Sequence, residues 1–211
     1  MTTQNSPRWD LTNVYPSLDS KEYSTDFEKL NTLIAGMESL IKEKAAGVTG
    51  KEPAGQIAAL AKEFIEHYNA ILLLGGTLRA YIESFVSTDS YNKDALRKES
   101  EFDLVAVRIG QFETQMLAWI GKVAERLPEM FTADPSLTAH RYFLEDSARQ
   151  SRYVMSEAEE LLAAELSLSG SNAWSKLHGM ITSQASAEVE VDGEVKKLPS
   201  PALINLRSHP D

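Results

Sequence analysis

The chain has 211 residues, of which 43% are hydrophobic and 25% are charged, and its net charge is −10 at neutral pH. This length is enough to bury a sizeable core in one large domain or two small ones. Phosphate binding requires clustered Lys and Arg, so the acidic balance argues against a nucleic-acid partner and against an anionic membrane surface. The sequence contains no cysteine, which excludes disulfides, thiolate metal sites and a cysteine nucleophile.

The hydrophobic runs of the sequence are short. The longest uninterrupted ones, such as Ala70 to Leu74, are far below the roughly 20 residues that a membrane span requires. The first residues also lack the apolar core of a signal peptide. We therefore expect a cytoplasmic protein with no membrane partner.

The chain opens with a segment, residues 8–18, that is too short and too interrupted by proline to be a helix. We expect its apolar side chains to fill a groove in the core: Trp9, Leu11, Val14, Tyr15 and Leu18. A helix is then predicted over residues 19–47, with Asp19 or Ser20 as its N-cap and Gly47 at its end.

The most apolar stretch runs from Ala54 to Ser87, and its hydrophobic residues recur every three or four positions, which is the helical period. Further apolar residues fall off that stripe. We therefore expect a central helix of about 50 Å that the rest of the chain surrounds. Gly75 and Gly76 lie in its middle, where each costs about 1 kcal/mol relative to alanine. A close helix crossing is the favoured explanation, and a local kink is the alternative.

A third helix is predicted from about Ser90 to Leu127, followed by a turn that Pro128 and Pro135 bracket. The apolar surface of this helix comes from residues spaced along its whole length.

Shorter helices follow. One is predicted over residues 137–150, and Ser156 with Glu159 forms an N-capping pattern that opens another. This helix is interrupted at residues 167–171 and resumes through Trp174.

The strongest strand signal comes late in the chain. Residues 188–198 alternate apolar and charged side chains around Asp192-Gly193, which predicts a β-hairpin at about residues 187–198 with two turn registers open. A new helix begins at Ala202. The expected fold is mainly α, a bundle of long antiparallel helices with one late hairpin.

Zinc peptidase chemistry requires His-Glu-x-x-His on a helix, where the two histidines bind the metal and the glutamate activates water. The chain has four histidines, and no two lie within five residues of each other. The nearest pattern is Glu63, Glu66 and His67, an inverted motif with Glu in place of its first His. We interpret these residues as part of a solvated strip on the central helix, with a metal site as the weaker alternative.

Other catalytic constellations are absent: the sequence has no Gly-x-Ser-x-Gly, no Walker loop and no Gly-x-Gly-x-x-Gly. Arg141, Arg149 and Arg152 could grip a carboxylate or a phosphate. Ion pairs with acidic residues at helical spacing are the simpler interpretation. The sequence therefore predicts no catalytic residue and no metal ligand, and it leaves any substrate-binding residue unknown.

Several short blocks, taken in their order along the chain, resemble the N-terminal region of the oligoendopeptidase F family of zinc metallopeptidases, which is related to thimet oligopeptidase. These blocks are Trp9-Asp10-Leu11, Tyr15-Pro16-Ser17-Leu18, Leu161 to Ser167, Gly170 to Leu177, Val189 to Gly193 and Leu206-Arg207-Ser208. The likeness covers the whole chain.

The resemblance implies a cytoplasmic, mostly α-helical enzyme that hydrolyses short unfolded peptides inside a deep channel. The family's zinc ligands, His-Glu-x-x-His and a further Glu, lie in a C-terminal catalytic domain that this chain lacks. Residues 1–211 are then expected to form a single helical N-terminal lobe, which could be subdivided into a long-helix part, 1–130, and a part with shorter helices and the hairpin, 131–211. Such a lobe forms part of the channel wall and is inactive alone.

The competing interpretation is a stand-alone helical module that binds a peptide or a protein without catalysis. Under the first interpretation the partners are short peptides and the catalytic domain. Apolar surface that this domain would cover could also lead to self-association.

Overall fold

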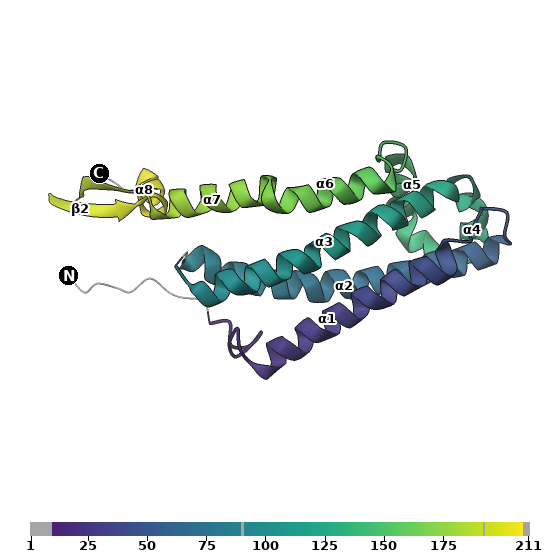
Figure 1. Cartoon of the computed structure of the whole chain (residues 1–211), viewed down its shortest axis with the longest axis horizontal. Coiled ribbons are helices and arrows are strands. Elements are labelled where there is room, and N and C mark those ends of the chain that lie inside the picture. The colour runs from purple at the N-terminus through teal and green to yellow at the C-terminus, as the bar shows by residue number, and fades with distance from the viewer. Residues whose placement is uncertain (1–9, 90, 192, 209–211) are drawn as a thin grey trace.

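Three long helices lie side by side and alternate in direction along the chain, as Figure 1 shows for a computed structural model of the protein. The structure describes residues 10–89, 91–191 and 193–208. The three helices are α1 (Lys21–Leu40), α2 (Ala54–Thr88) and α3 (Lys93–Lys122).

The starts of α1 and α3 follow from their capping residues. The Ser20 hydroxyl accepts a hydrogen bond from the Tyr23 backbone N–H at 3.2 Å, which makes Ser20 rather than Asp19 the N-cap. The Asn92 side chain accepts in the same way from Ala95 N–H at 3.0 Å. Beyond Leu40 the first helix continues as a single π-helical turn, η1 (Ile41–Ala45), which the sequence did not predict.

The segment before α1 is held against the bundle, but Val14, which was expected to fill the same groove, is 41% exposed. Tyr15 and Leu18 are buried, and the Tyr81 hydroxyl of α2 donates to the Tyr15 carbonyl at 2.8 Å. Trp9, which belongs to the same prediction, lies outside the described residues.

The central helix is confirmed almost to the residue, but the expectation that protein surrounds it is wrong. α2 contacts α1, α3 and α4 (Leu127–Ala133), yet Leu72 and Leu73 on its remaining side are 48% and 76% exposed. By length and composition alone α2 could also cross a membrane, a test that the core helix of a soluble bundle passes as well.

The paired glycines of α2 differ in their surroundings. A Cβ on Gly75 would lie 3.6 Å from Leu30 of α1 and 4.0 Å from Ile109 of α3, which is ordinary van der Waals contact. A Cβ on Gly76 would meet nothing within 4 Å. Helices α1 and α3 do approach α2 at Gly75, but the space there does not require a glycine.

The turn predicted between Pro128 and Pro135 is instead a helix, α4, preceded by the 3₁₀ turn η2 (Ala124–Arg126). Proline is accommodated in a first helical turn because its missing N–H would be unpaired there anyway. Leu127, Met130 and Phe131 are buried at helical spacing, which the prediction overlooked. A second 3₁₀ turn, η3 (Pro135–His140), leads into α5 (Arg141–Gln150).

The rest of the chain forms an arm beside the bundle. Helices α6 (Glu157–Ser169) and α7 (Ser171–Gln184) run as a nearly continuous rod along α3, interrupted at Gly170 as predicted (Figure 1). The N-capping pattern is confirmed, because Ser156 N–H donates to the Glu159 carboxylate at 2.9 Å.

Strands β1 (Ser186–Val191) and β2 (Glu194–Pro199) then pair as the predicted antiparallel hairpin, with Val191 opposite Glu194. This pairing selects the register whose turn lies between Val191 and Glu194. Gly193 has φ 76°, and Asp192 lies outside the described residues. The described chain ends in α8 (Ser200–Asn205) and the 3₁₀ turn η4 (Leu206–Ser208). The mainly α fold class with one late hairpin is confirmed.

Candidate functional site

A groove runs over the surface of α3, between the end of α1 and the loop that precedes α6. It encloses a cavity of about 510 Å³, within the range typical of ligand sites. Fourteen residues line it: Glu38, Ile41, Lys42, Ala45, Ala46, Gln111, Phe112, Thr114, Gln115, Ala118, Trp119, Lys122, Val154 and Met155.

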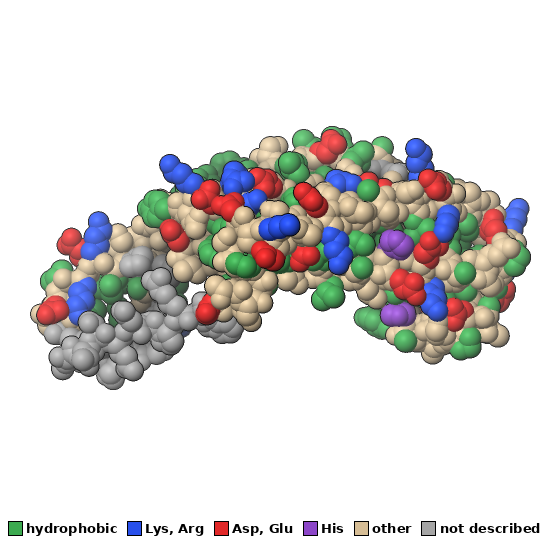
Figure 2. Space-filling view, turned by 90° about the horizontal axis from the view of Figure 1, so that it is seen from below, with side chains coloured by type: hydrophobic (Ala, Val, Ile, Leu, Met, Phe, Trp, Pro, Cys, Tyr) green, Lys and Arg blue, Asp and Glu red, His purple; other side chains and the backbone are tan. Residues whose placement is uncertain are grey.

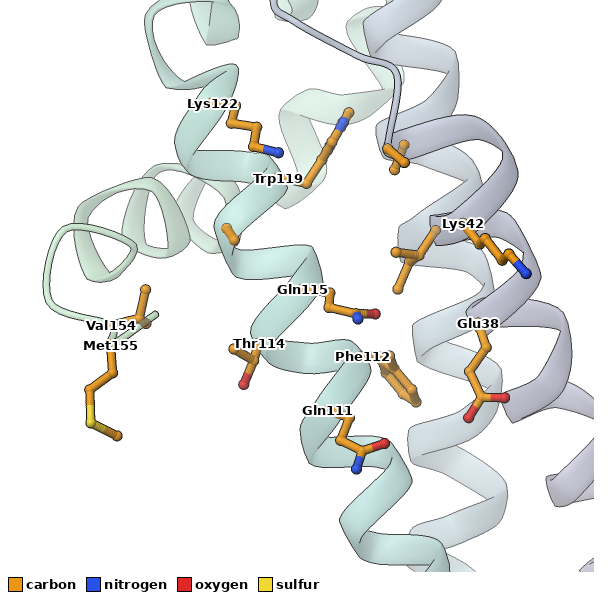
Figure 3. Close-up of a pocket in the computed structure, with 14 residues that line it drawn as sticks. Glu38, Lys42, Gln111, Phe112, Thr114, Gln115, Trp119, Lys122, Val154 and Met155 are labelled. Atoms are coloured by element: carbon orange, nitrogen blue, oxygen red, sulfur yellow. The ribbon is translucent and has the colours of Figure 1, made fainter. Parts of the chain in front are cut away.

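The floor of the groove is one face of α3. Gln111, Gln115, Ala118 and Lys122 are spaced by four, three and four residues, which places them in one row along a helix. Figure 3 shows the Gln111 and Gln115 side chains extending from α3 toward α1, and the Lys122 side chain pointing toward Trp119. The floor therefore carries polar side chains along its length and an amine at one end.

Two different elements form the walls. On one side the π-helical turn η1 contributes Ile41 and Ala45, and on the other the loop before α6 contributes Val154 and Met155 (Figure 3). A π-helical turn widens the winding of a helix and often marks a functional site. The walls are apolar where the floor is polar.

The aromatic residues of the groove are fixed by the core beneath it. Phe112 and Trp119 are buried, and the Trp119 ring meets Phe64 of α2 edge to face with ring centroids 4.9 Å apart. The Trp119 indole N–H is buried and has no hydrogen-bond partner among the described residues. The apolar lining is thus a rigid surface rather than a set of mobile side chains.

The local charge of the groove differs from that of the whole chain. Its one carboxylate, Glu38, accepts two hydrogen bonds from the Arg108 guanidinium at 2.9 Å each, and this contact raises the pKa of Arg108. Lys42 and Lys122 have no ion pair within the described part of the chain. The groove therefore has a net positive charge. On the face of the molecule drawn in Figure 2, by contrast, acidic and basic side chains are interspersed.

A second cavity, of about 590 Å³, lies between α3, α5 and α6. There the Tyr68 hydroxyl donates to the Glu113 carboxylate at 2.6 Å, and the Tyr68 ring stacks on Phe143. Burial and the neighbouring Glu113 carboxylate raise the pKa of Tyr68. The phenol is held protonated as a hydrogen-bond donor to Glu113, which is a structural contact between α2 and α3.

The Glu63–His67 window has structural partners on α2. The Glu63 carboxylate pairs with Lys44 at 2.7 Å, Glu66 is exposed, and His67 Nδ1 lies 3.1 Å from the Glu63 carbonyl. Among the residues that the structure describes, no group of three or more His, Cys, Asp or Glu side chains could hold a metal ion. The zinc ion that the resemblance implies has no fitting set of donors in that part of the chain.

Two of the three clustered arginines form the predicted ion pairs, whereas Arg152 forms none with the described side chains. Arg141 pairs with Glu145 at 3.2 Å, and Arg149 pairs with Asp146. The Glu157 side chain, proposed as a further partner, lies outside the described side chains, as does His209.

The sequence analysis missed the residues of the groove. The signal was a row of polar or small residues, Gln111, Gln115, Ala118 and Lys122, along one side of the third predicted helix. A polar row of this kind is also typical of a solvated helix face. The walls could not be foreseen, because the π-helical turn and the loop lie far from α3 in the sequence.

The arm carries a large exposed apolar surface. No side chain of α7 is buried, all of its residues being described, and Trp174 is 70% exposed. The exposed apolar side chains of the two helices are Leu161, Leu162, Leu166, Trp174, Leu177, Met180 and Ile181. We call this set the arm face. Exposed apolar side chains that form a contiguous patch typically mark an interaction site.

The comparisons with known proteins support one family. Residues 120–185 match the model of the N-terminal domain of M3 peptidases, described as Oligopeptidase F. No curated protein and no solved structure matches the chain. The matched range runs from the end of α3 to the first residue after α7 and contains the Leu161 to Leu177 blocks, whereas the resemblance of residues 9–18 lies outside it and stays a prediction. The match confirms that this chain resembles the N-terminal region of an oligoendopeptidase F family protein.

Proposed function

We propose that the chain is the N-terminal, non-catalytic lobe of a zinc-dependent oligoendopeptidase that hydrolyses short peptides. Its role is to form part of the wall of the substrate channel. The observation that carries the proposal is the arm face, because it lies within the segment that matches the peptidase family and leaves apolar surface for a further domain to cover.

In this proposal the lobe supplies no reacting group and acts only by limiting which substrates can enter the channel. A rigid helical wall narrows access to a reaction centre, so that an extended peptide enters and a folded protein does not. The metal and its ligands belong to the catalytic domain in this proposal, since the described residues offer no donor set for zinc. A cytoplasmic location is part of the same proposal, and cell fractionation would test it.

Complementation tests the proposal. The purified chain is mixed with the catalytic domain of an oligoendopeptidase F enzyme, and cleavage of a short fluorogenic peptide is followed. We expect cleavage to rise when both parts are present. Trp174→Glu places a charge on the arm face and should weaken the effect at least tenfold, since a buried unpaired charge is costly. Tyr142→Glu, on the exposed surface of α5, is the matched control and should change nothing. Cleavage that is independent of the chain would contradict the proposal.

The second candidate function is a stand-alone peptide-binding module, which the groove over α3 favours. Reading the encoding frame beyond Asp211 separates the two candidates. A downstream His-Glu-x-x-His favours the peptidase lobe, whereas a stop codon favours the module. The module also predicts that Trp174→Glu leaves all binding intact.

A further inference from the structure

We propose that the second cavity, between α3, α5 and α6, binds an aliphatic polyamine, with one ammonium group at Glu113 and another at Glu160. This inference goes beyond the proposed function, because the ligand is neither a peptide nor a metal ion and the catalytic domain takes no part in its binding. Its supports are two carboxylates without a cationic partner, a buried hydroxyl without a hydrogen bond, and a set of apolar side chains.

The two carboxylates of the cavity, Glu113 of α3 and Glu160 of α6, are both only partly exposed. Glu113 accepts a hydrogen bond from the Tyr68 hydroxyl at 2.6 Å, and Glu160 accepts one from the Met155 backbone N–H at 3.0 Å. These bonds hold the carboxylates in place without neutralising them. Neither carboxylate has an ion pair with a described residue, and the described lining contains no Lys or Arg. Carboxylates removed from water are normally paired with a cation, so the cavity is expected to take one.

The hydroxyl is that of Ser147 on α5, which also lines the cavity and is 8% exposed. It has no hydrogen bond among the described residues. The Thr114 and Ser167 hydroxyls of the same cavity, by contrast, donate to carbonyls one turn back in their own helices, at 3.0 and 2.9 Å. Such a bond is the usual one for a hydroxyl within a helix. The Ser147 oxygen is therefore left as an acceptor for a ligand N–H.

The rest of the lining favours an organic cation over a metal ion. Mg²⁺ and Ca²⁺ need about six or more oxygen ligands. The described residues hold no group of three or more His, Cys, Asp or Glu side chains that could bind a metal. Apolar side chains of α3 and α6, such as Leu117 and Ala163, would instead contact the methylene chain of an amine. An ammonium group is also attracted to an aromatic ring, and Phe143 lines the cavity.

The number of carboxylates sets the number of amines. A monoamine would leave one of the two carboxylates without a cation, whereas a polyamine carries two or more ammonium groups on one chain. The cavity, at about 590 Å³, lies within the range of small-molecule sites. Because Glu113 belongs to α3 and Glu160 to α6, one bound molecule would link the arm to the bundle.

The first measurement is a calorimetric titration of the full chain with spermidine. An ionic strength of about 0.15 M screens the attraction of distant surface charges. We expect saturable binding of one spermidine per chain, with butylamine at least tenfold weaker because it satisfies only one carboxylate. An equal concentration of MgCl₂ should not displace spermidine. Equal affinities for the two amines, no saturable heat, or displacement by MgCl₂ would overturn the proposal.

The second measurement locates the contacts. Glu113→Gln and Glu160→Gln should each weaken spermidine binding about tenfold through the loss of one charge-assisted hydrogen bond. The glutamine carbonyl can still accept from the same protein donor, so each variant keeps its structural hydrogen bond. Glu125→Gln removes the same charge from an exposed residue of η2 outside the cavity and is the matched control. Equal weakening in all three variants would reveal general attraction to an acidic chain and would overturn the assignment.

The third measurement tests the hydroxyl and the link between helices. Ser147→Ala should weaken spermidine binding severalfold with an unchanged circular dichroism spectrum. Spermidine should also slow hydrogen exchange in α6 of the unsubstituted chain. Unchanged affinity in Ser147→Ala, or unchanged exchange in α6 at saturating spermidine, would contradict binding in this cavity.

These outcomes are separate from those of the complementation test. Spermidine binding is measured on the chain alone, so it can be present when complementation fails and absent when complementation succeeds.

Discussion

Three tyrosines join the N-terminal segment to the bundle, and their hydroxyl groups have different surroundings. Tyr15 donates to the Asp26 carboxylate at 2.8 Å, and Tyr81 donates to the Tyr15 carbonyl at 2.8 Å. The Tyr23 hydroxyl is buried without a hydrogen-bond partner among the described residues. The rings of Tyr15 and Tyr81 meet edge to face with centroids 5.1 Å apart.

Tyr81→Phe should lower the free energy of unfolding by about 1–2 kcal/mol, because it leaves the buried Tyr15 carbonyl without its donor. Urea unfolding followed by circular dichroism measures the change. Tyr23→Phe is the matched control and should be neutral or slightly stabilising, since it removes a buried hydroxyl that has no partner. A larger loss in Tyr23→Phe than in Tyr81→Phe would show that the hydrogen bonds are assigned to the wrong rings.

The same cluster predicts an alkaline limit to stability. Burial, with the nearby Glu101 carboxylate, raises the pKa of Tyr23 to about 12 from an ordinary value of about 10. The unfolded chain therefore loses this proton first, so the contribution to stability is complete below pH 10 and is lost as the pH rises toward 12. Unfolding free energies measured between pH 9 and pH 12 should fall less steeply in Tyr23→Phe. An identical slope in both proteins would contradict the assignment.

For single residues, the sequence predicted that Tyr15 and Leu18 would lie in a groove of the core, because large apolar side chains in a short non-helical segment are usually buried. It could not predict which hydroxyl group pairs with which acceptor. The Tyr81 contact joins residues 66 positions apart, and no periodicity encodes such a pair.

Substitution of a single glycine by alanine tests the helical conformation of α2. Gly76 lies inside α2, and a Cβ there would meet nothing within 4 Å. Gly76→Ala should therefore raise the free energy of unfolding by about 0.5–1 kcal/mol through the higher helix propensity of alanine. The expected gain appears as a higher urea midpoint with an unchanged slope. A loss of stability would mean that α2 bends or is contacted at this residue.

Gly170 should behave in the opposite way. A Cβ on Gly170 would lie 2.9 Å from the Leu166 carbonyl oxygen, which is too close for the backbone to remain in place. Gly170→Ala should destabilise the junction of α6 and α7 and speed hydrogen exchange in the residues around it. Gly179→Ala, inside α7 with open space around it, is the control and should slow exchange or leave it unchanged. Equal exchange in both variants would argue against a conformational role for Gly170.

Most elements could be predicted because helical and strand periods are local properties. α2 and the hairpin were predicted nearly to the residue, Ser156 was recognised as a cap, and Ser20 was one of two candidates for the cap of α1. α4 was missed because its prolines indicated a turn, although proline also suits the first turn of a helix. The π-helical turn η1 has no sequence signature comparable to these, so it could not be foreseen.

At the scale of the whole molecule, one lysine links the far part of the arm to the bundle. Lys176 of α7 pairs with Asp103 and, at 3.4 Å, with Glu99, both on α3. Burial alone would lower the pKa of Lys176, but these two carboxylates raise it. The described residues of α7 contribute no buried apolar side chain to this contact.

Lys176→Met should release α7 from α3 while leaving the bundle folded. We expect hydrogen exchange in residues 171–184 to become at least severalfold faster, with exchange in α2 unchanged. Lys197→Met, an exposed lysine of β2, is the matched control. Unchanged protection of α7 would show that its packing, rather than this ion pair, holds the arm.

The groove over α3 and the arm face depend on how the whole molecule is arranged. The sequence analysis predicted neither the position of the groove nor the exposure of the arm face. Trp174 and Leu177 were predicted on a helix, but exposure depends on what the fold leaves uncovered. The groove arises only when η1, α3 and the loop before α6 come together. The resemblance to the peptidase family, by contrast, could be read from short blocks of sequence, and the match over residues 120–185 confirms it.

The central proposal is that this chain forms part of the wall of a substrate channel and does not supply the catalytic centre. The most direct test incubates the purified chain with zinc and a fluorogenic peptide of about nine residues, and measures both cleavage and bound metal. We predict no cleavage above background and no stoichiometric zinc after dialysis. Turnover that a chelator abolishes, together with one tightly held zinc ion per chain, would contradict the account.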